Sequence, residues 1–267
     1  MFVANDKDGN TLYADFGIKY DECFCQKCGE PVIHKIGSGG KRPHFSHRSG
    51  SVCSYDKDYK SEWHIRIQEY FPKEAREVRF VDKETGNIHI ADIFIKDSNT
   101  VIEVQHSPIS KEEFIERTVF HINNNRRIAW LFDESTSNPE SNSFGRFRED
   151  DCGWENGDYS SRCFKWLRKP RKIIQGFNLK QLNEYYSICV YTGTEGDIFH
   201  RIVGEHCAFD YVVFSLTDIE MSENMNVDFF FGYDDYWWRE DRKPQRMPYL
   251  PFTYKPKVNI RRNRGRF

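Results

Sequence analysis

Residues 88–107 constrain the fold of this chain more than any other stretch, because they have the pattern of two short strands joined by a polar turn. Asp92 lies on the first strand, and Glu103 and Gln105 lie on the second, where alternation puts both on one face. With a turn centred on residues 97–98, an antiparallel register sets Asp92 opposite Glu103, with Cβ atoms about 5 Å apart. Two opposed carboxylates repel unless a cation lies between them, so this pair predicts a divalent metal site.

Composition and charge exclude several classes of protein. The formal net charge is −2, whereas residues 254–267 are strongly basic. The first residues become polar at once, and no apolar run approaches the roughly 20 residues that a membrane span needs, so we expect no secretory signal, no membrane contact and a cytoplasmic location. In that setting the 8 cysteines are expected to be metal-bound or free rather than disulfide-bonded.

Residues 23–53 are rich in cysteine and histidine. A two-residue cysteine knuckle is followed by a pair of histidines with the same spacing, and two thiolates with two imidazoles suit a closed tetrahedral zinc site. The candidate ligands are Cys25, Cys28, His44 and His47. Cys53 or Cys23 could replace one of the histidines, and a redox pair is the alternative for the knuckle alone.

Hydrophobic periodicity and capping residues predict a compact mixed α/β core. Ser61 and Ser110 are in position to cap two helices, the second through a capping box with Glu113. The predicted order is helix, strand, strand, strand, helix, strand, over residues 61–71, 77–81, the hairpin in 88–107, 110–123 and 127–132. Residues 186–191 and 211–216 are further β-like runs, and residues 228–238 are densely aromatic.

The opposed carboxylates suggest a particular chemistry. Metal-dependent cleavage of a phosphodiester needs carboxylates to hold Mg²⁺ or a similar hard cation, which activates a bound water and offsets charge on the phosphate. Asp92 and Glu103 can supply the ligands, and Gln105 can position the water or the phosphate. Glu62 could complete the metal shell, with Glu77 as the competitor for that place.

An aspartate at the end of one strand followed by Glu-x-Lys on the next resembles the core of the PD-(D/E)xK nuclease superfamily, from which this chain departs by having Gln105 where lysine is usual. The wider pattern resembles the competence protein CoiA-like family, in which glutamine at this place is the usual form. The matching pieces span residues 20–135: they are Cys25-x-x-Cys28, His44-Phe-Ser-His47, Ser61-Glu-Trp-His64, Ala91-Asp92, residues 102–107, Arg117 and residues 128–132.

The resemblance implies a fold class and a domain order. It implies a mixed α/β protein with a small β-rich zinc module at residues 1–56 and a restriction-endonuclease-like core at residues 57–135. The resemblance does not extend with comparable strength to residues 136–267, which are expected to form an α+β extension that could contact DNA or a partner. The catalytic candidates that carry over are Asp92, Glu103, Gln105, Glu62 and His64. The candidate nucleic-acid-binding residues are Ser107 and Arg117 by resemblance, and Lys165 and Lys169 from a run of basic and aromatic residues.

The function that we expect is a metal-dependent deoxyribonuclease with structural Zn²⁺ and catalytic Mg²⁺ or Mn²⁺. Because a neutral amide cannot supply positive charge, Gln105 shifts that task to the metal or to His64, His106 or Arg117. The alternative is a non-catalytic DNA-binding or adaptor protein that keeps the nuclease fold, and RNA is a third, weaker substrate. The sequence leaves open the form of the DNA, endo or exo cleavage, a homodimer and a DNA-processing protein partner.

Overall fold

The computed structural model of the 267-residue chain describes these residues: 1–53, 55, 60–133, 135, 147–150, 163–166, 186–191, 198–201, 207–209 and 213–215. Side chains are described at these positions up to residue 135, except at Lys111, and at 187–189. The aromatic segment 228–238 and Lys169 lie outside these ranges, and Lys165 is described through its backbone only. Within the described part, no helix has both the length and the apolar character needed to cross a membrane.

The N-terminal segment forms a five-stranded antiparallel sheet in the order β2-β1-β3-β4-β5. Its strands are β1 (Val3–Asn5), β2 (Thr11–Tyr13), β3 (Cys23–Phe24), β4 (Pro31–Lys35) and β5 (His44–His47). Ala4, Val32 and Phe45 are buried in its core together with the thiols of Cys23, Cys25 and Cys53. A core this small depends on added staples, so the cysteines are expected to matter for its stability.

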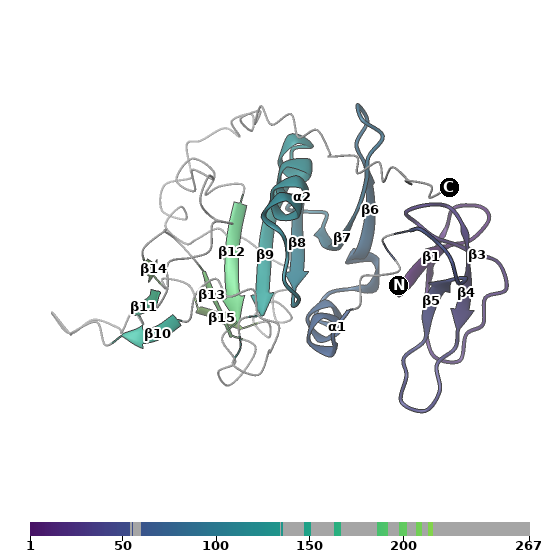
Figure 1. Cartoon of the computed structure of the whole chain (residues 1–267), viewed down its shortest axis with the longest axis horizontal. Helices are drawn as coiled ribbons and strands as arrows, with labels where there is room; N and C mark the ends of the chain where they lie inside the picture. Colours follow the sequence, from purple (N-terminus) through teal and green to yellow (C-terminus); the bar gives the residue numbers. More distant parts are fainter. Residues whose placement is uncertain are drawn as a thin grey trace, which may run out of the picture.

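A seven-stranded mixed sheet forms the centre of the molecule, in the order β15-β13-β12-β9-β8-β7-β6 (Figure 1). Its strands are β6 (Arg76–Val81), β7 (Ile88–Ile95), β8 (Thr100–Gln105), β9 (Arg127–Asp133), β12 (Tyr186–Tyr191), β13 (Ile198–Arg201) and β15 (Val213–Ser215). β6, β7 and β8 are antiparallel, whereas β8, β9 and β12 run parallel. The predicted β-runs 186–191 and 211–216 therefore contribute strands to the same sheet as the hairpin.

Two capped helices cover opposite faces of this sheet. Helix α1 (Glu62–Glu69) follows the N-cap Ser61 and buries Ile67 against Ile93, Ile102 and Leu131. Helix α2 (Lys111–Asn123) follows the N-cap Ser110 and packs on Trp130. Because Trp130 and Leu131 are consecutive in β9, they point to opposite faces. Figure 1 shows α2 in front of β8 and β9, and α1 at the end of the sheet nearer the N-terminal strands.

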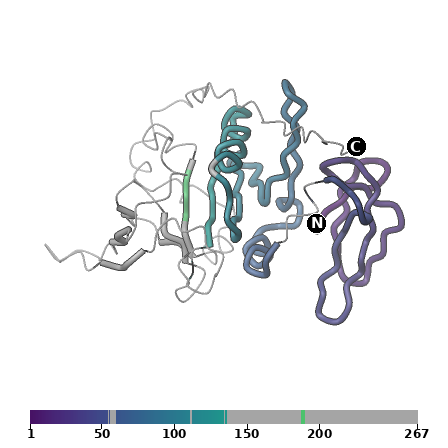
Figure 2. Tube along the Cα trace, in the orientation of Figure 1, coloured from purple at the N-terminus to yellow at the C-terminus, as the bar shows by residue number. Residues whose placement is uncertain are grey.

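The predicted order of elements is confirmed from α1 to β9, with a short 3₁₀ turn (Lys73–Ala75) before β6. A third, three-stranded sheet contains β10 (Phe147–Asp150), β11 (Cys163–Trp166) and β14 (Cys207–Phe209), and Lys165 lies in β11. The N-terminal sheet lies beside β6 (Figure 2) and contacts it through Arg79, whose Nε donates to the Gln26 carbonyl at 2.7 Å. These contacts place the cysteine-rich segment next to the carboxylate hairpin.

Candidate functional site

Four cysteine and histidine side chains converge at one corner of the N-terminal sheet: they are Cys25, Cys28, His47 and Cys53. Their ligand atoms all lie within 4.8 Å of one another. Cys25 Sγ lies 4.0 Å from Cys53 Sγ, and Cys28 Sγ lies 3.2 Å from His47 Nε2. The group could therefore bind a metal ion such as zinc, for which three thiolates and one imidazole are a suitable closed set.

This cluster corrects the predicted ligand set at one position, because Cys53 takes the place of His44. His44 and His47 are three residues apart in the extended strand β5, so their side chains point to opposite faces. His44 Nδ1 lies 3.0 Å from the Arg42 carbonyl oxygen instead. Cys23, the other spare thiol, lies outside the cluster, with its Sγ 3.8 Å from the Tyr20 carbonyl.

The raised pKa values of the thiols are consistent with a metal site whose cysteines lose their protons only when an ion binds. Burial raises the pKa of Cys25. Burial, followed by the neighbouring thiols of Cys25 and Cys53, raises the pKa of Cys28 to about 12. Thiols crowded in this way stay neutral without a cation, and a zinc ion would displace their protons on binding.

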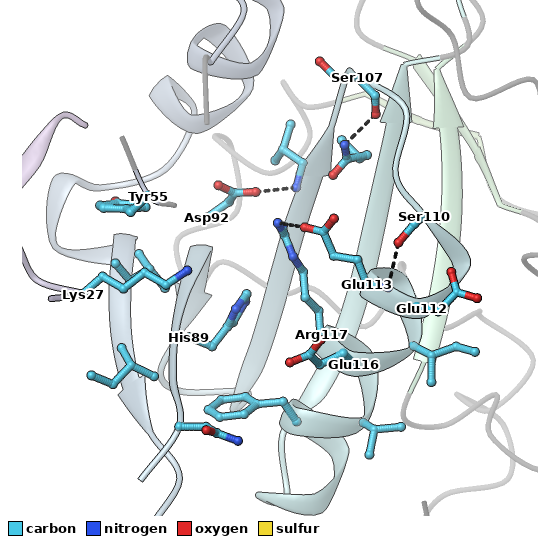
Figure 3. A pocket seen from close by; sticks show the side chains of 18 of the residues that line it. Lys27, Tyr55, His89, Asp92, Ser107, Ser110, Glu112, Glu113, Glu116 and Arg117 are labelled. Atoms are coloured by element: carbon cyan, nitrogen blue, oxygen red, sulfur yellow. Dashed lines mark hydrogen bonds and ion pairs between the residues drawn. The ribbon is translucent and has the colours of Figure 1, made fainter. Parts of the chain in front are cut away.

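A groove of about 810 Å³ opens between the carboxylate hairpin and the two helices (Figure 3). Its walls include side chains from α1, β7, β8 and α2, together with Lys27 from the cysteine-rich segment and Tyr55, which follows that segment. Asp92, His64, Gln105, Ser107 and Arg117 are among the lining residues. The groove thus gathers most of the residues that the sequence predicted to be catalytic or nucleic-acid-binding.

The pairing of β7 with its two neighbouring strands is interrupted where the groove meets the hairpin. The predicted register is confirmed by the pairing of Ile93 with Ile102, but the β7–β8 ladder ends there. On the other side, the β6–β7 ladder skips Glu77, whose φ of 51° is left-handed. Asp92 therefore pairs with neither strand, and its Oδ2 accepts a hydrogen bond from the Val104 amide at 2.9 Å. A ladder that stops in this way frees a carboxylate to face the groove.

Asp92 belongs to a buried ionic network that the sequence did not predict. Lys60 Nζ lies 2.8 Å from Asp92 Oδ1 and 3.1 Å from Glu77 Oε1, and Tyr55 donates to Glu77 Oε2 at 2.7 Å. His64 Nε2 also lies 3.1 Å from Asp92 Oδ1. Burial alone would raise the pKa of Asp92, but the charges of His64 and Lys60 and their hydrogen bonds hold it well below its usual range. Asp92 is therefore an ionised carboxylate at neutral pH.

Glu103 has a separate set of partners on the α2 side. It is almost fully buried at 1% exposure, with Oε1 at 2.9 Å from His89 Nε2 and Oε2 at 3.3 Å from Arg117 Nη1. Arg117 also pairs with Glu113 one turn earlier in α2. His121 Nε2 lies 3.8 Å from Glu103 Oε1. Burial, followed by the charges of His89, Arg126 and Arg117, holds the pKa of His121 well below its usual range, so this ring is neutral.

The sequence-predicted Mg²⁺ or Mn²⁺ between Asp92 and Glu103 does not fit this arrangement of side chains. All four carboxylate oxygens already have partners, and these are Lys60 and His64, the Val104 amide, His89, and Arg117. A hard cation takes six or more oxygen ligands. Among the described residues, no group of three acidic, histidine or cysteine side chains that includes Asp92 converges on one point. An ion shared by this pair would have to displace their present partners.

The other predicted site residues differ in whether their side chains reach the groove. Glu62 does not reach the groove: its side chain is 79% exposed and lies 3.4 Å from Arg42. Because residues two apart on a helix point about 200° from each other, Glu62 and His64 cannot both face the sheet. Gln105 faces the groove and donates through Nε2 to the Ser107 carbonyl at 2.6 Å. Glu77, the competitor for Glu62, is the carboxylate that joins Asp92 through Lys60.

The paired state of Glu77 predicts a pH-dependent contribution to stability. Burial would raise its pKa, but Lys60, the N-terminus and Tyr55 lower it below the usual value. A carboxylate whose pKa is lowered in the folded state stabilises the fold at pH values above its unfolded pKa of about 4.3. That stabilisation is lost as the pH falls through the pKa of the folded state. We expect Glu77→Gln to cost about 1–3 kcal/mol at pH 7 and less near pH 3, as measured by urea unfolding. The exposed Glu74→Gln is the control, and a cost that did not change with pH would contradict this reading of the network.

Comparison with known protein families supports the resemblance noted in the sequence. The family model of the competence protein CoiA N-terminal domain matches residues 17–56, and the model of the competence protein CoiA nuclease-like domain matches residues 87–152. Neither a curated protein nor a solved structure matches the chain. The first match covers the metal-ligand cluster, and the second covers Asp92, Glu103 and Arg117. Over these two segments the chain is therefore similar to the CoiA-like family of competence proteins.

Proposed function

We propose that the groove binds DNA and cleaves its phosphodiester bonds in a metal-dependent reaction, with zinc as a structural ion at Cys25, Cys28, His47 and Cys53. The observation that carries this proposal is the convergence in one groove of the buried, ionised Asp92 with the basic side chains of Lys60, His64 and Arg117. Asp92 and Arg117 lie within the segment that matches a nuclease-like domain. The three antiparallel strands, the helix α2 and the parallel strand β9 support a restriction-endonuclease-like core.

The cations of the groove suit the charge that develops during hydrolysis. A phosphodiester gains negative charge on its oxygens as a nucleophile attacks, and fixed positive groups that face these oxygens stabilise the transition state. Lys60, held by Asp92 and Glu77, supplies such a charge in the same groove that is lined by Gln105, which replaces the usual lysine. Asp92 can accept a hydrogen bond from an attacking water, and the Gln105 amide can orient it.

The acidic side chains of α2 favour dependence on a divalent ion. Figure 3 shows Glu112, Glu113 and Glu116 along the wall formed by α2, with Arg117 pairing with Glu113. A wall of carboxylates repels phosphate, and divalent cations offset that repulsion. When bound, such an ion also lowers the pKa of a coordinated water. Cleavage and tight DNA binding are therefore both expected to need a divalent metal.

The competing function is a DNA-binding or adaptor protein without turnover. It is favoured by one specific observation: every oxygen of Asp92 and Glu103 is already paired, and Gln105 is neutral. In that reading the buried ion pairs stabilise the fold and catalyse nothing.

Incubation of the full chain with labelled single-stranded, duplex and branched DNA separates the two functions. The nuclease proposal expects cleavage of at least one of these DNAs with Mg²⁺ or Mn²⁺, and none with EDTA. Retention of DNA that EDTA does not change, together with no cleavage of any of them, would overturn the nuclease proposal and support the adaptor. Incubation with RNA of the same sequence tests whether cleavage depends on deoxyribose in place of ribose.

A further inference from the structure

Two histidines and a glutamate meet beneath the groove, and the proposed nuclease chemistry leaves the histidines without a role. His89 comes from β7, Glu103 from β8 and His121 from α2, so three separate elements bring them together. Their ligand atoms all lie within 4.8 Å of one another. The rings of His89 and His121 approach edge to face, with centroids 4.8 Å apart.

His121 is unusual because it is fully buried and polar. Its side chain has 0% exposure, and neither ring nitrogen has a hydrogen-bond partner among the described residues. An unsatisfied buried polar group costs about 1–3 kcal/mol, so natural proteins rarely keep one without a compensating ligand. The rings of Phe80 and Phe120 pack against His121 and offer no acceptor. The Nε2 atom instead faces Glu103 at 3.8 Å, too far for a hydrogen bond.

The spacing of the three atoms suits a metal ion between them. Ligands about 2.0–2.1 Å from a tetrahedral ion lie about 3.3 Å from one another. The distances from Glu103 Oε1 are 2.9 Å to His89 Nε2 and 3.8 Å to His121 Nε2, on either side of that value. Arg117 bonds the other oxygen of Glu103, Oε2, and so leaves Oε1 directed at the histidines. This is the way in which second-shell partners orient a ligating carboxylate.

The structure assigns a metal site to His89, Glu103 and His121, selective for a transition metal such as Zn²⁺ or Mn²⁺ over Mg²⁺. Imidazole nitrogens favour transition metals, whereas Mg²⁺ prefers oxygen ligands and keeps its waters. Three protein ligands leave a fourth position for water or a phosphate oxygen. His89 lines the groove, so that position is reached from the side where DNA is proposed to bind (Figure 3). The site deepens the proposed function by naming its metal, but its metal binding can be measured without DNA or turnover.

Titration of the untagged, metal-free full chain with Co²⁺ alone tests this assignment. Wild type is expected to bind two ions per chain, one with the thiolate-to-metal absorption of the cysteine cluster and one without it. His121→Phe and His89→Gln are each expected to lose the second ion and to keep the thiolate absorption. The matched control is His106→Gln, which changes a groove histidine paired with Asp133 and is expected to bind both ions.

Three results would overturn the assignment. The first is a wild-type chain that binds one ion, through thiolates only. The second is a second ion that stays in both folded histidine variants, with circular dichroism unchanged. The third is a second ion that His121→Phe retains and Asp92→Asn loses, which would place it at the Asp92–Glu103 pair. Loss of the second ion in the histidine variants would uphold the site even if no DNA is cleaved, so the two proposals fail separately.

Discussion

Replacing Cys53 with serine is expected to release the structural metal and to unfold the N-terminal sheet. Cys53 Sγ lies 4.0 Å from Cys25 Sγ within a cluster of four ligand atoms, and this sheet has only a small apolar core. In small zinc modules the metal-binding free energy, on the order of 10 kcal/mol, is the folding free energy. Co²⁺ bound with thiolate-to-metal absorption is expected to fall from about one ion per chain to near zero.

Matched variants separate the observed ligand set from the predicted one. Cys23→Ser changes a buried thiol outside the cluster, and His44→Ala removes the histidine that the structure turns away. Both are expected to keep their zinc, whereas His47→Ala is expected to lose it. Loss of zinc from His44→Ala, with zinc retained in Cys53→Ser, would restore the ligand set predicted from the sequence.

Replacing Lys60 with methionine is expected to weaken both the fold and the proposed catalysis. Methionine keeps most of the length of the side chain but leaves Asp92 and Glu77 without the cation that now lies 2.8 and 3.1 Å from them. Removing one partner of a buried ionic group costs about 3–5 kcal/mol. Loss of a preorganised charge that stabilises a transition state lowers a rate about 10²–10³-fold.

Urea unfolding and single-turnover cleavage of the same preparations test both effects. Lys27→Met is the matched control, because Lys27 lines the same groove, whereas Lys60 is the lysine that bridges Asp92 and Glu77. Lys60→Arg retains the charge and is expected to recover part of the stability. A Lys60→Met protein as stable as Lys27→Met would contradict the buried network. Normal cleavage by a folded Lys60→Met would remove Lys60 from the catalytic site.

Local patterns in the sequence were sufficient for the elements and for the register of the hairpin. Capping by Ser61 and Ser110 and the polar turn at 97–98 act over a few residues, and the pairing of Ile93 with Ile102 confirms the predicted alignment. The same alignment did not give the partners of Asp92, because the ladder ends beside it and the carboxylate turns to Lys60. That neighbour is 32 residues away in the sequence, and no short-range pattern indicates it.

Periodicity alone could have shown that two predicted pairs of site residues, one on a helix and one on a strand, do not point the same way. Glu62 and His64 are two residues apart on a helix, and His44 and His47 are three apart on a strand, so neither pair can share a face. Cys53 could not be chosen over His44 from spacing, because the chain between β5 and Cys53 sets where that thiol lies. The meeting of His121 with His89 and Glu103 depends on how α2 packs on the sheet, which helix periodicity alone does not give.

Ionised Asp92 is proposed to serve a DNA-cleaving groove, and one comparison of cleavage rates decides whether it does. Single-turnover cleavage of labelled DNA is measured with Mn²⁺ for wild type, Asp92→Asn and Asp97→Asn, the last being an exposed aspartate in the turn of the same hairpin. We expect Asp97→Asn to cleave like wild type and a folded Asp92→Asn to cleave more slowly by about 10³-fold or more. Equal rates for the two variants, or no cleavage by wild type, would contradict it.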